Sequence, residues 1–475
     1  MFIDARSIVS PPLFTVADLR VVEQHWESTH PDESLMEKAG AAAAAFSITL
    51  VGAPARPILI LAGQGNNGGD ALMTAHLLAA RGYQIDVVGC AADPTSHHTA
   101  ANAWQNWRAG GGTALPDIPL SREYRLVIDG LFGIGLQRDI TGEEARWIEQ
   151  VNAFHCPRLA LDVPSGLDSD SGRIRGHALR ADHTLTFIGL KPGLLTADGP
   201  DYCGKLHLDT LGVDSQAGVS TSGIALTGLE NRHRLPPRAR NSHKGQYGHI
   251  GILGGSPGMV GAALIAGRAA LQQGAGSVTL GVLNERIVVD YGEPRLMFSV
   301  PENLLDVQTT VLAVGPGLGQ SPRAHALLER ALTAPYPLVL DADALNLLAR
   351  DPALIQQTAH RHAPTLLTPH PGEAARLLGV NTAAIQHNRI EAAYRLSTLT
   401  RAHVALKGAG TVISHPDGHY AINTSGGAWL AQAGSGDRLT GMVAALLGQG
   451  MAAGDALEAA VWLHGNAALR PNGPV

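Results

Sequence analysis

The sequence predicts an α/β protein of two consecutive domains, each built around a mostly parallel sheet that helices cover on both faces. Two observations lead to this prediction. Runs of Val, Ile and Leu recur between stretches of helical periodicity, and one irregular segment divides these runs into two groups. The runs are continuous rather than alternating, which is typical of strands buried on both faces of a parallel sheet. A length of 475 residues allows two such domains.

Eleven apolar runs are expected to form the strands. In the first half they are RPILILAG, YQIDVVGC, YRLVIDGLFG, RLALDVPSG and HTLTFIG. In the second half they are HIGILGG, SVTLGVL, TVLAVGPG, PLVLDAD, PTLLTPH and HVALKGAG. The segment from Asp214 to His243 lacks sustained periodicity and contains the pair Pro236 and Pro237, so it is the best domain boundary. We therefore expect domains at 1–222 and 223–475.

Composition narrows the classes of function. Charged residues make up only 16% of the chain, and 56 residues are glycine. A high glycine content is typical of proteins whose loops wrap around phosphates. The net charge of −6 and the lack of a basic run argue against nucleic acid or an anionic membrane as partner. Cys90, Cys156 and Cys203 form no CxxC pair, which fits a reducing compartment. With no signal-peptide pattern and no apolar run near ~20 residues, we expect a soluble cytoplasmic protein.

A glycine-rich turn follows the first expected strand, in PILILAGQGNNGGDALMTAHLLAARG. Gly63, Gly65 and Gly68 satisfy the GxGxxG pattern, and backbone amides at the start of the following helix can hold an anion. A dinucleotide-binding Rossmann site is therefore one interpretation. Against it, the acid expected about 20 residues further on would be Asp86, which lies inside a strand. The alternative is that the segment binds no ligand: it would form an Asx turn, and Asp70 would only stabilise the start of the helix.

Two further strand ends carry carboxylates, Asp129 in VIDGLFGIGL and Asp162 in LDVPSGLD. Because the carboxyl ends of parallel strands meet at one edge of a sheet, we expect a polar pocket there. Asn67, Asp129 and Ser165 offer only oxygen ligands, which suit a hard cation of low charge rather than zinc. Lys191, in FIGLKPG, is a candidate acid or phosphate contact in this pocket, although such a lysine by itself is usually a surface residue.

The second half contains no GxxxxGK[ST], so a nucleotide there would not bind through a Walker loop. Its most informative segment is AQAGSGDRLTGMVAALL, in which residues 434–436 put free amides at a helix start beside Asp437. An anion hole next to a carboxylate base is suited to moving a phosphoryl group onto a hydroxyl. The plain alternative is an ordinary glycine-rich N-cap. His370, held between two prolines after another strand, is a candidate ligand contact.

The first-half motifs also carry a family resemblance. FTVADLRVVEQ, ESLMEKAG, GQGNNGGDALMTA, DGLFGIGL, DVPSGLDSDSG and FIGLKPGL, in this order, resemble the NAD(P)H-hydrate epimerase domain of the bifunctional NAD(P)H-hydrate repair enzymes, over residues 10–215. The resemblance implies a Rossmann-like three-layer domain. One departure is Ala71, where the family usually carries glycine.

This resemblance implies two ligand sets in the first domain. The residues that would hold the hydrated nicotinamide nucleotide are Asn66, Asn67, Gly68, Gly69, Asp70, Gly133, Ile134, Gly135, Leu136, Gln137, Arg138, Asp139 and Asp162. The residues that would bind K⁺ are Asn67, Asp129 and Ser165. We assign the acid chemistry of epimerisation to Asp162, helped by Lys191.

The second half resembles the ribokinase-like fold, and specifically the ADP-dependent (S)-NAD(P)H-hydrate dehydratase domain, over residues 225–475. LTPHPGE, VALKGAGT and AGSGD, in this order, carry the resemblance. It implies that the hydrated dinucleotide contacts Gly261, Gly319, His370 and Asp437, of which Asp437 is catalytic. It implies that the adenine nucleotide is bound by Lys407, Gly408, Ala409, Gly410, Thr411 and Gly436. One departure is Arg438, where a small apolar residue is common.

The function expected from both resemblances is repair of nicotinamide nucleotides. The first domain would interconvert the R and S forms of hydrated NAD(P)H, and the second would dehydrate the S form with ADP, giving NAD(P)H, AMP and phosphate. The expected cofactors are K⁺ in the epimerase site and Mg²⁺ in the dehydratase site, with ADP as co-substrate. The expected partners are these small molecules and a further copy of the chain in a homo-oligomer.

Three other interpretations stay open at this point. A Rossmann dehydrogenase would use the GxGxxG turn for NAD and transfer a hydride to a second substrate. A ribokinase-like small-molecule kinase would phosphorylate a stable alcohol with ATP. A non-enzymatic binding module is disfavoured because Asp129 and Asp162 are present.

Overall fold

The computed structural model describes residues 3–4, 10–89, 98–216, 218–235 and 237–468. Cys90 and Pro236 therefore lie outside the described residues, whereas Cys156 and Cys203 are free cysteines. The chain divides into two compact units, Met1–Gly223 and Ile224–Val475, and each is described by itself. In the described part of the chain, no helix is both long and apolar enough to span a membrane.

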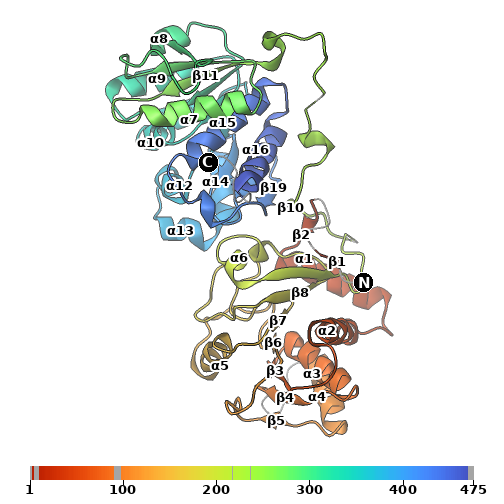
Figure 1. The fold of residues 1–475 in the computed structure, drawn as a ribbon. Helices are drawn as coiled ribbons and strands as arrows, with labels where there is room; N and C mark the ends of the chain where they lie inside the picture. The colour runs from red at the N-terminus through yellow and green to blue at the C-terminus, as the bar shows by residue number, and fades with distance from the viewer. Residues whose placement is uncertain (1–2, 5–9, 90–97, 217, 236, 469–475) are drawn as a thin grey trace. The chain divides into compact units, whose positions relative to one another are not determined.

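Strands and helices alternate along the first unit (Figure 1). Its strands are β1 (Ile3–Asp4), β2 (Pro12–Leu13), β3 (Ile58–Ala62), β4 (Ile85–Val88), β5 (Ala114–Leu115), β6 (Leu126–Gly130), β7 (Arg158–Leu161), β8 (His183–Phe187) and β9 (Lys205–Asp209). Its helices are α1 (Val16–Thr29), α2 (Leu35–Val51), α3 (Asn66–Ala79), α4 (His98–Ala109), α5 (Gly142–Asn152), the short α6 (Gly199–Tyr202) and the 3₁₀ turn η2 (Pro192–Leu194).

The sheet of the first unit runs in the order β1-β9-β8-β7-β6-β3-β4-β5. All neighbours are parallel except β1 and β9, so the predicted parallel sheet is confirmed. The chain leaves β3 for β4 on one side and returns to β6 on the other. In open α/β sheets such a reversal opens a crevice at the carboxyl ends of the two strands, where ligands bind.

Alternate residues of β3 face two helical layers. Ile58 and Ile60 pack into a core with residues of α1, α2, α3 and α4. Leu59 and Leu61 pack on the opposite face, in a core with residues of α5. All four side chains are fully buried, which explains why this strand is a continuous apolar run and not an alternating one.

The second unit repeats this scheme with a longer sheet. Its strands are β10 (Gly223–Leu226), β11 (His249–Gly254), β12 (Ser277–Val282), β13 (Met297–Ser299), β14 (Val311–Val314), β15 (Leu338–Leu340), β16 (Thr365–Leu367), β17 (His403–Leu406), β18 (Val412–Ser414) and β19 (Tyr420–Asn423). Its helices are α7 (Val260–Gln272), α8 (Pro301–Leu304), α9 (Pro322–Leu332), α10 (Asp343–Arg350), α11 (Pro352–Ala359), α12 (Pro371–Leu378), α13 (Thr382–His387), α14 (Arg389–Thr400), α15 (Ser435–Gly448) and α16 (Ala453–Ala468). Three 3₁₀ turns complete the described elements: η3 (Asn231–His233), η4 (Lys244–Tyr247) and η5 (Ala428–Leu430).

In the second unit the strand order is β13-β12-β11-β14-β15-β16-β17-β18-β19-β10. Strands β13 to β17 are parallel, and β18 and β19 extend the sheet antiparallel. Residues of α7, α15 and α16 share one buried core with the sheet. Helices α8 and α9 contribute no residue to that core, but α8 contacts β11 and β12, and α9 contacts β14. The six strands expected in this half all form, so the α/β prediction is confirmed here as well.

Helices α7 and α15 lie side by side on one face of this sheet (Figure 1). Gly441 makes their close approach possible, because a Cβ built there would lie 2.0 Å from the backbone oxygen of Ala266. Their packing fixes the position of the first turn of α15, where the AGSGD motif lies.

Replacing Gly441 by alanine should therefore destabilise the protein, although alanine favours a helix by about 1 kcal/mol relative to glycine. Overpacking a core typically costs about 1–3 kcal/mol, which outweighs that gain. Urea unfolding checks the prediction. Gly261→Ala on α7 is the matched control, because a Cβ there meets nothing within 4 Å and stability should not fall. Equal stability of G441A and the wild type would show that the two helices are not in backbone contact.

Two candidate active sites

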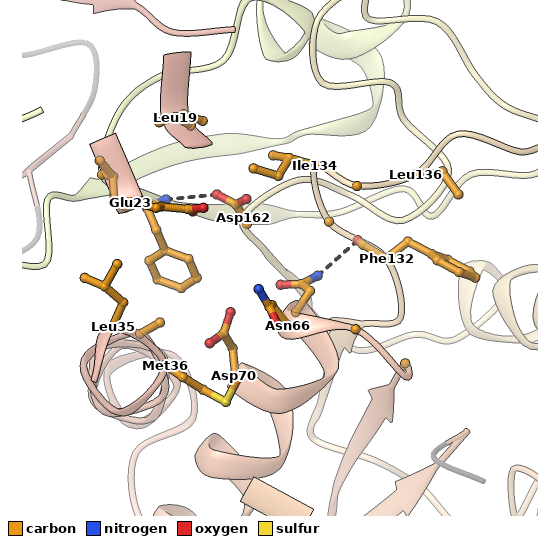
Figure 2. A pocket seen from close by; sticks show the side chains of 18 of the residues that line it. Leu19, Glu23, Leu35, Met36, Asn66, Asp70, Phe132, Ile134, Leu136 and Asp162 are labelled. Atoms are coloured by element: carbon orange, nitrogen blue, oxygen red, sulfur yellow. Dashed lines mark hydrogen bonds between the residues drawn. The ribbon is translucent and has the colours of Figure 1, made fainter. Parts of the chain in front are cut away.

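A cavity of about 1380 Å³ lies at the crevice of the first unit, where β3 and β6 end (Figure 2). It is larger than the ~300–1,000 Å³ of most small-molecule sites, which suits a dinucleotide. The predicted site residues that line it are Asn66, Asn67, Asp70, Gly133, Ile134, Gly135, Leu136, Gln137, Arg138, Asp162 and Lys191. The predicted residues outside its lining are Gly68, Gly69, Asp129, Asp139 and Ser165.

The glycine-rich turn after β3 has two roles. It lets helix α3 pack closely against its neighbours, and it borders the cavity. Gly65 is the N-cap of α3, and no side chain caps the helix there, so its first amides border the cavity. A Cβ on Gly68 would lie 1.9 Å from the backbone oxygen of Gly63. A Cβ on Gly69 would lie 2.3 Å from Cε of Met36. Gly68 and Gly69 thus allow the helix to dock, and Asn66 and Asn67 face the ligand space.

Asp86, the acid that a dinucleotide fingerprint would need, is engaged elsewhere. Within β4 its carboxylate accepts a hydrogen bond from Arg122 Nη1 at 2.6 Å and one from the Tyr124 hydroxyl at 2.8 Å. It does not line the cavity. This arrangement argues against the dehydrogenase interpretation, because no ribose hydroxyl in the cavity could reach that carboxylate.

A cluster of oxygens lies behind the cavity wall. Asp129 is fully buried and accepts hydrogen bonds from Ser165 Oγ at 2.6 Å and Ser165 N at 2.8 Å. Asn67 Nδ2 donates to the Phe132 carbonyl at 3.0 Å, and Ser165 Oγ lies 3.2 Å from the same carbonyl. Asn67 Oδ1 is buried without a hydrogen-bond donor among the described residues. Burial raises the pKa of Asp129 to about 6.

Asp162 and Lys191 form an ion pair at the cavity. Asp162 follows β7 with φ of +64°, a left-handed conformation that non-glycine residues adopt rarely and that is found at functional sites. Lys191 Nζ contacts Asp162 Oδ1 and donates to Thr186 Oγ1 at 2.9 Å and to the Phe187 carbonyl at 2.8 Å. With 1% exposure, Lys191 is a buried, fully satisfied cation and not an ordinary surface lysine.

Glu23 also belongs to this site, although it was not among the predicted site residues. It lies on α1 and lines the cavity beside Asp162 and Asp70 (Figure 2). Burial, followed by the nearby Asp162 charge, raises the pKa of Glu23 to about 7. Burial and the same neighbours also raise the pKa of Asp70. Glu23 stands in the FTVADLRVVEQ segment that carries the family resemblance, but only the three-dimensional arrangement places it at the cavity.

The second unit brings several of its predicted site motifs together around another buried lysine. Asp341 follows β15 and is 1% exposed. It accepts hydrogen bonds from Lys407 Nζ at 2.9 Å and from Thr440 Oγ1 at 2.7 Å. A Cβ on Gly436 would lie 3.2 Å from Lys407 Nζ, so the KGAGT loop meets the start of α15. The strand-end rule applied to Asp129 would also have found Asp341, which the sequence left unassigned.

Asp437 lies in the first turn of α15, next to this pair. Gly434, the N-cap, has φ of +84°, which a glycine adopts without strain. Burial and then the Asp341 charge raise the pKa of Asp437 to about 6, while Lys407 opposes the shift. Asp437 is therefore a carboxylate that is ionised at neutral pH yet basic enough to accept a proton.

The other predicted contacts of this unit lie on neighbouring loops. Lys407 N donates to the Pro369 carbonyl at 2.9 Å, which joins the KGAGT and TPHPGE loops. His370 caps α12 by accepting from Gly372 N at 3.0 Å, so it has a structural role. Gly319 N donates to Asp343 Oδ2 at 2.8 Å.

Three smaller placements complete this set. Thr411 Oγ1 donates to the Gly408 carbonyl at 3.2 Å, so the KGAGT loop closes on itself around Ala409 and Gly410. Gly261 lies in the first turn of α7. Arg438 is close enough to the buried His464 to help lower the pKa of that histidine, after burial itself.

Known proteins resemble the chain over both units. A family model described as "NAD(P)H-hydrate dehydratase" matches residues 250–472, and one described as "YjeF-related protein N-terminus" matches residues 32–193. The bifunctional NAD(P)H-hydrate repair enzyme Nnr of Escherichia coli K12 is 40% identical over 91% of this chain and 84% of that protein. Its counterpart from Coxiella burnetii is 37% identical over 94% of this chain and 91% of that protein.

Among solved structures, the ADP/ATP-dependent NAD(P)H-hydrate dehydratase from Bacillus subtilis, co-crystallized with ATP/Mg²⁺, is 35% identical. The match covers 50% of this chain and 85% of that one, with a TM-score of 0.44.

Two α/β units, each with buried acid and base groups at the carboxyl edge of its sheet, define a two-domain enzyme. The chain belongs to the family of bifunctional NAD(P)H-hydrate repair enzymes. The predicted family, the predicted fold class of a Rossmann-like domain followed by a ribokinase-like domain, and the predicted repair function are thereby confirmed.

The ion pair of Lys407 and Asp341 yields a stability prediction. Removing one partner of a buried pair typically costs about 3–5 kcal/mol, so Lys407→Met should lower the free energy of unfolding at pH 7 by that order. The deficit should shrink as the pH falls from 7 to 5, because the unpaired Asp341 then acquires a raised pKa and takes up a proton. Urea unfolding at both pH values checks this. The double variant D341N/K407M should recover part of the loss, and a double variant as unstable as the sum of its single changes would contradict the coupling.

Proposed function

We propose that the cavity of the first unit binds hydrated NAD(P)H and epimerises it at C6. The observation that carries this proposal is the Asp162 and Lys191 pair at a cavity large enough for a dinucleotide. When the C6 hydroxyl leaves as water, the ring nitrogen lone pair forms an iminium bond to C6. A carboxylate near that cation lowers its energy. Water then adds to the opposite face of C6 and loses a proton.

Lys191 holds the Asp162 carboxylate in position to stabilise the iminium cation. Its ammonium and the Phe187 amide, 3.1 Å from Asp162 Oδ1, both donate to the carboxylate and stabilise its charged form. The α3 amides and the 133–138 loop would hold the phosphates and the remainder of the dinucleotide.

Potassium is the cation that the oxygen cluster fits. Asn67 Oδ1 is a buried acceptor without a donor, and Asp129 and Ser165 supply further oxygens of a hard-cation type. Asn67, Asp129 and Ser165 would hold the ion, which would supply positive charge and fix the loops that end β3, β6 and β7.

Replacing K⁺ by a bulky organic cation should slow epimerisation by on the order of tenfold or more, as for other groups that organise a site around a metal. A direct readout exists as well, because an ion that binds only the folded state raises the melting temperature. K⁺ should do so for the wild type and not for Asn67→Ala, whose carbonyl oxygen is gone. If K⁺ did not change the melting temperature of the wild type, the oxygen cluster would not be a potassium site and would only stabilise the turns that form it.

For the second unit we propose dehydration of the S epimer driven by ADP. Asp437 takes the proton of the C6 hydroxyl as its oxygen attacks the β-phosphorus of ADP, and AMP leaves as the bond to the α-phosphate breaks. The phosphorylated hydrate then loses phosphate from C6. Loss of a proton from C5 restores the double bond of NAD(P)H. The amides of residues 434–436 and the Lys407 ammonium, which meet at the start of α15, would stabilise the charge that develops on the transferred group.

Magnesium fits this site as a companion of the nucleotide. Among the described residues, no group of three or more His, Cys, Asp or Glu side chains could hold a metal. A hard cation carried mainly by phosphate oxygens needs only one or two carboxylates, and Asp437 and Asp341 offer them. It would neutralise charge on the phosphates.

Asp437→Asn should abolish dehydration and leave epimerisation intact. Loss of a general base typically reduces the rate by about 10² to 10⁴. In the wild type, kcat/KM for dehydration should rise with pH until Asp437 is ionised, at a pKa of about 6, and stay level above it. Recovery of nicotinamide absorbance measures dehydration, and chromatography of the two epimers measures epimerisation. A folded D437N that kept more than about a tenth of the rate would remove Asp437 from the mechanism.

Three broader proposals accompany these sites. Residues 1–222 would carry the epimerase and 223–475 the dehydratase. The protein would act in the cytoplasm, and it would assemble as a homo-oligomer.

A further inference from the structure

Epimerisation needs a group that gives a proton to the departing hydroxyl and takes one back when water returns. The hydroxyl leaves from one face of C6 and returns on the other. Asp162 Oδ1 already accepts from Lys191, the Phe187 amide and Thr186 Oγ1 at 3.3 Å. Because these donors already occupy Asp162 Oδ1, another acid that lines the cavity is better placed to give a proton to the hydroxyl.

Glu23 occupies the right place for such an acid. Figure 2 shows its carboxylate turned toward the same space as those of Asp162 and Asp70, but from a different element, α1. Leu19 and Val22, both 1% exposed, anchor this helix in the core, so the position of Glu23 is fixed. No hydrogen bond or ion pair engages its side chain in the part of the chain that the structure describes.

We infer that Glu23 is a catalytic residue of the epimerase site and exchanges the proton with the C6 hydroxyl. This inference rests on the proposed epimerase function. In one direction the Glu23 carboxyl gives its proton to the departing hydroxyl, the C6–O bond breaks with its electron pair on oxygen, and the ring nitrogen supplies the pair for the iminium bond. Asp162 balances the cation. Water adds to the other face of C6, and its proton passes through the cavity water back to the Glu23 carboxylate.

The charge environment agrees with this role. Burial, and then Asp162, raises the pKa of Glu23 to about 7, and Glu27 adds to the shift. Lys191 and Arg20 act in the opposite direction, and Asp70 is a further acid that feels the Glu23 charge. The acid form is thus present up to about pH 7, and its fraction falls tenfold per pH unit above that value. A donor and its conjugate base are both available near neutral pH, which general acid–base catalysis requires.

The test compares Glu23→Gln with Glu27→Gln in the full-length protein. Glu27 is an exposed carboxylate one turn further along α1 that also borders the cavity, so E27Q removes the same charge from the same side of the cavity without removing the inferred proton donor. Epimerisation is followed by chromatography from the pure R epimer over pH 6 to 9. E23Q should lose about 10² to 10⁴ of the rate, and E27Q should keep it. Glu23→Asp, which retains an acid, should recover part of the loss.

The pH dependence of the rate and the melting temperature separate loss of a proton donor from loss of structure. The wild-type rate should fall above pH 7 and the residual E23Q rate should not, a difference that a merely structural defect would not produce. E23Q should melt no lower than the wild type at pH 8, because it removes a buried charge. An E23Q rate within a factor of about three of the wild type would overturn the inference and leave the epimerase function standing. A wild-type protein without epimerisation would instead overturn the proposed function.

Discussion

Both sites depend on a lysine ammonium that is buried against a strand-end aspartate. Lys191 is paired with Asp162 in the first unit, and Lys407 with Asp341 in the second. A buried charge is tolerated only when a partner and hydrogen bonds replace its water, and the carboxyl edge of a parallel sheet supplies both. The backbone carbonyl of Phe187 and the hydroxyl of Thr440 complete these two pairs.

These pairs set the proton affinity of the carboxyls around them. Burial, and then the anionic partner of each pair, raises the pKa of a neighbouring acid, to about 7 for Glu23 and about 6 for Asp437. A Glu with a pKa near 7 is partly protonated at neutral pH, which suits a group that protonates a leaving hydroxyl. An Asp near 6 is ionised there, which suits a group that takes a proton from an attacking hydroxyl. The same device thus supports two opposite proton transfers on one chain.

The sequence was sufficient for the parallel core and for motifs at strand ends. All eleven continuous apolar runs became strands, because a strand buried on two faces needs nothing but apolar residues. Short or partly exposed strands such as β9, with its alternating KLHLD, and the antiparallel pair β18 and β19 gave no such signal. Glu23 stands in the FTVADLRVVEQ segment and was still not predicted as a site residue, because its place at the cavity comes from the packing of α1, which the segment alone does not show. Asp86 shows the converse, since it drew attention in the sequence and turns out to hold protein structure together. His370 caps α12, and its contact with the ligand stays a prediction.

Two complementary sites on one chain should cooperate, one that interconverts the epimers of hydrated NADH and one that consumes the S form. A direct test supplies a mixture of R and S hydrate, with ADP, Mg²⁺ and K⁺, and follows the nicotinamide absorbance to its end point. All the NADH in the mixture should be recovered, with one AMP formed per NADH, because epimerisation keeps converting the R form into the substrate of the second site. Recovery that stops at the S fraction, or that proceeds without ADP, would contradict this cooperation.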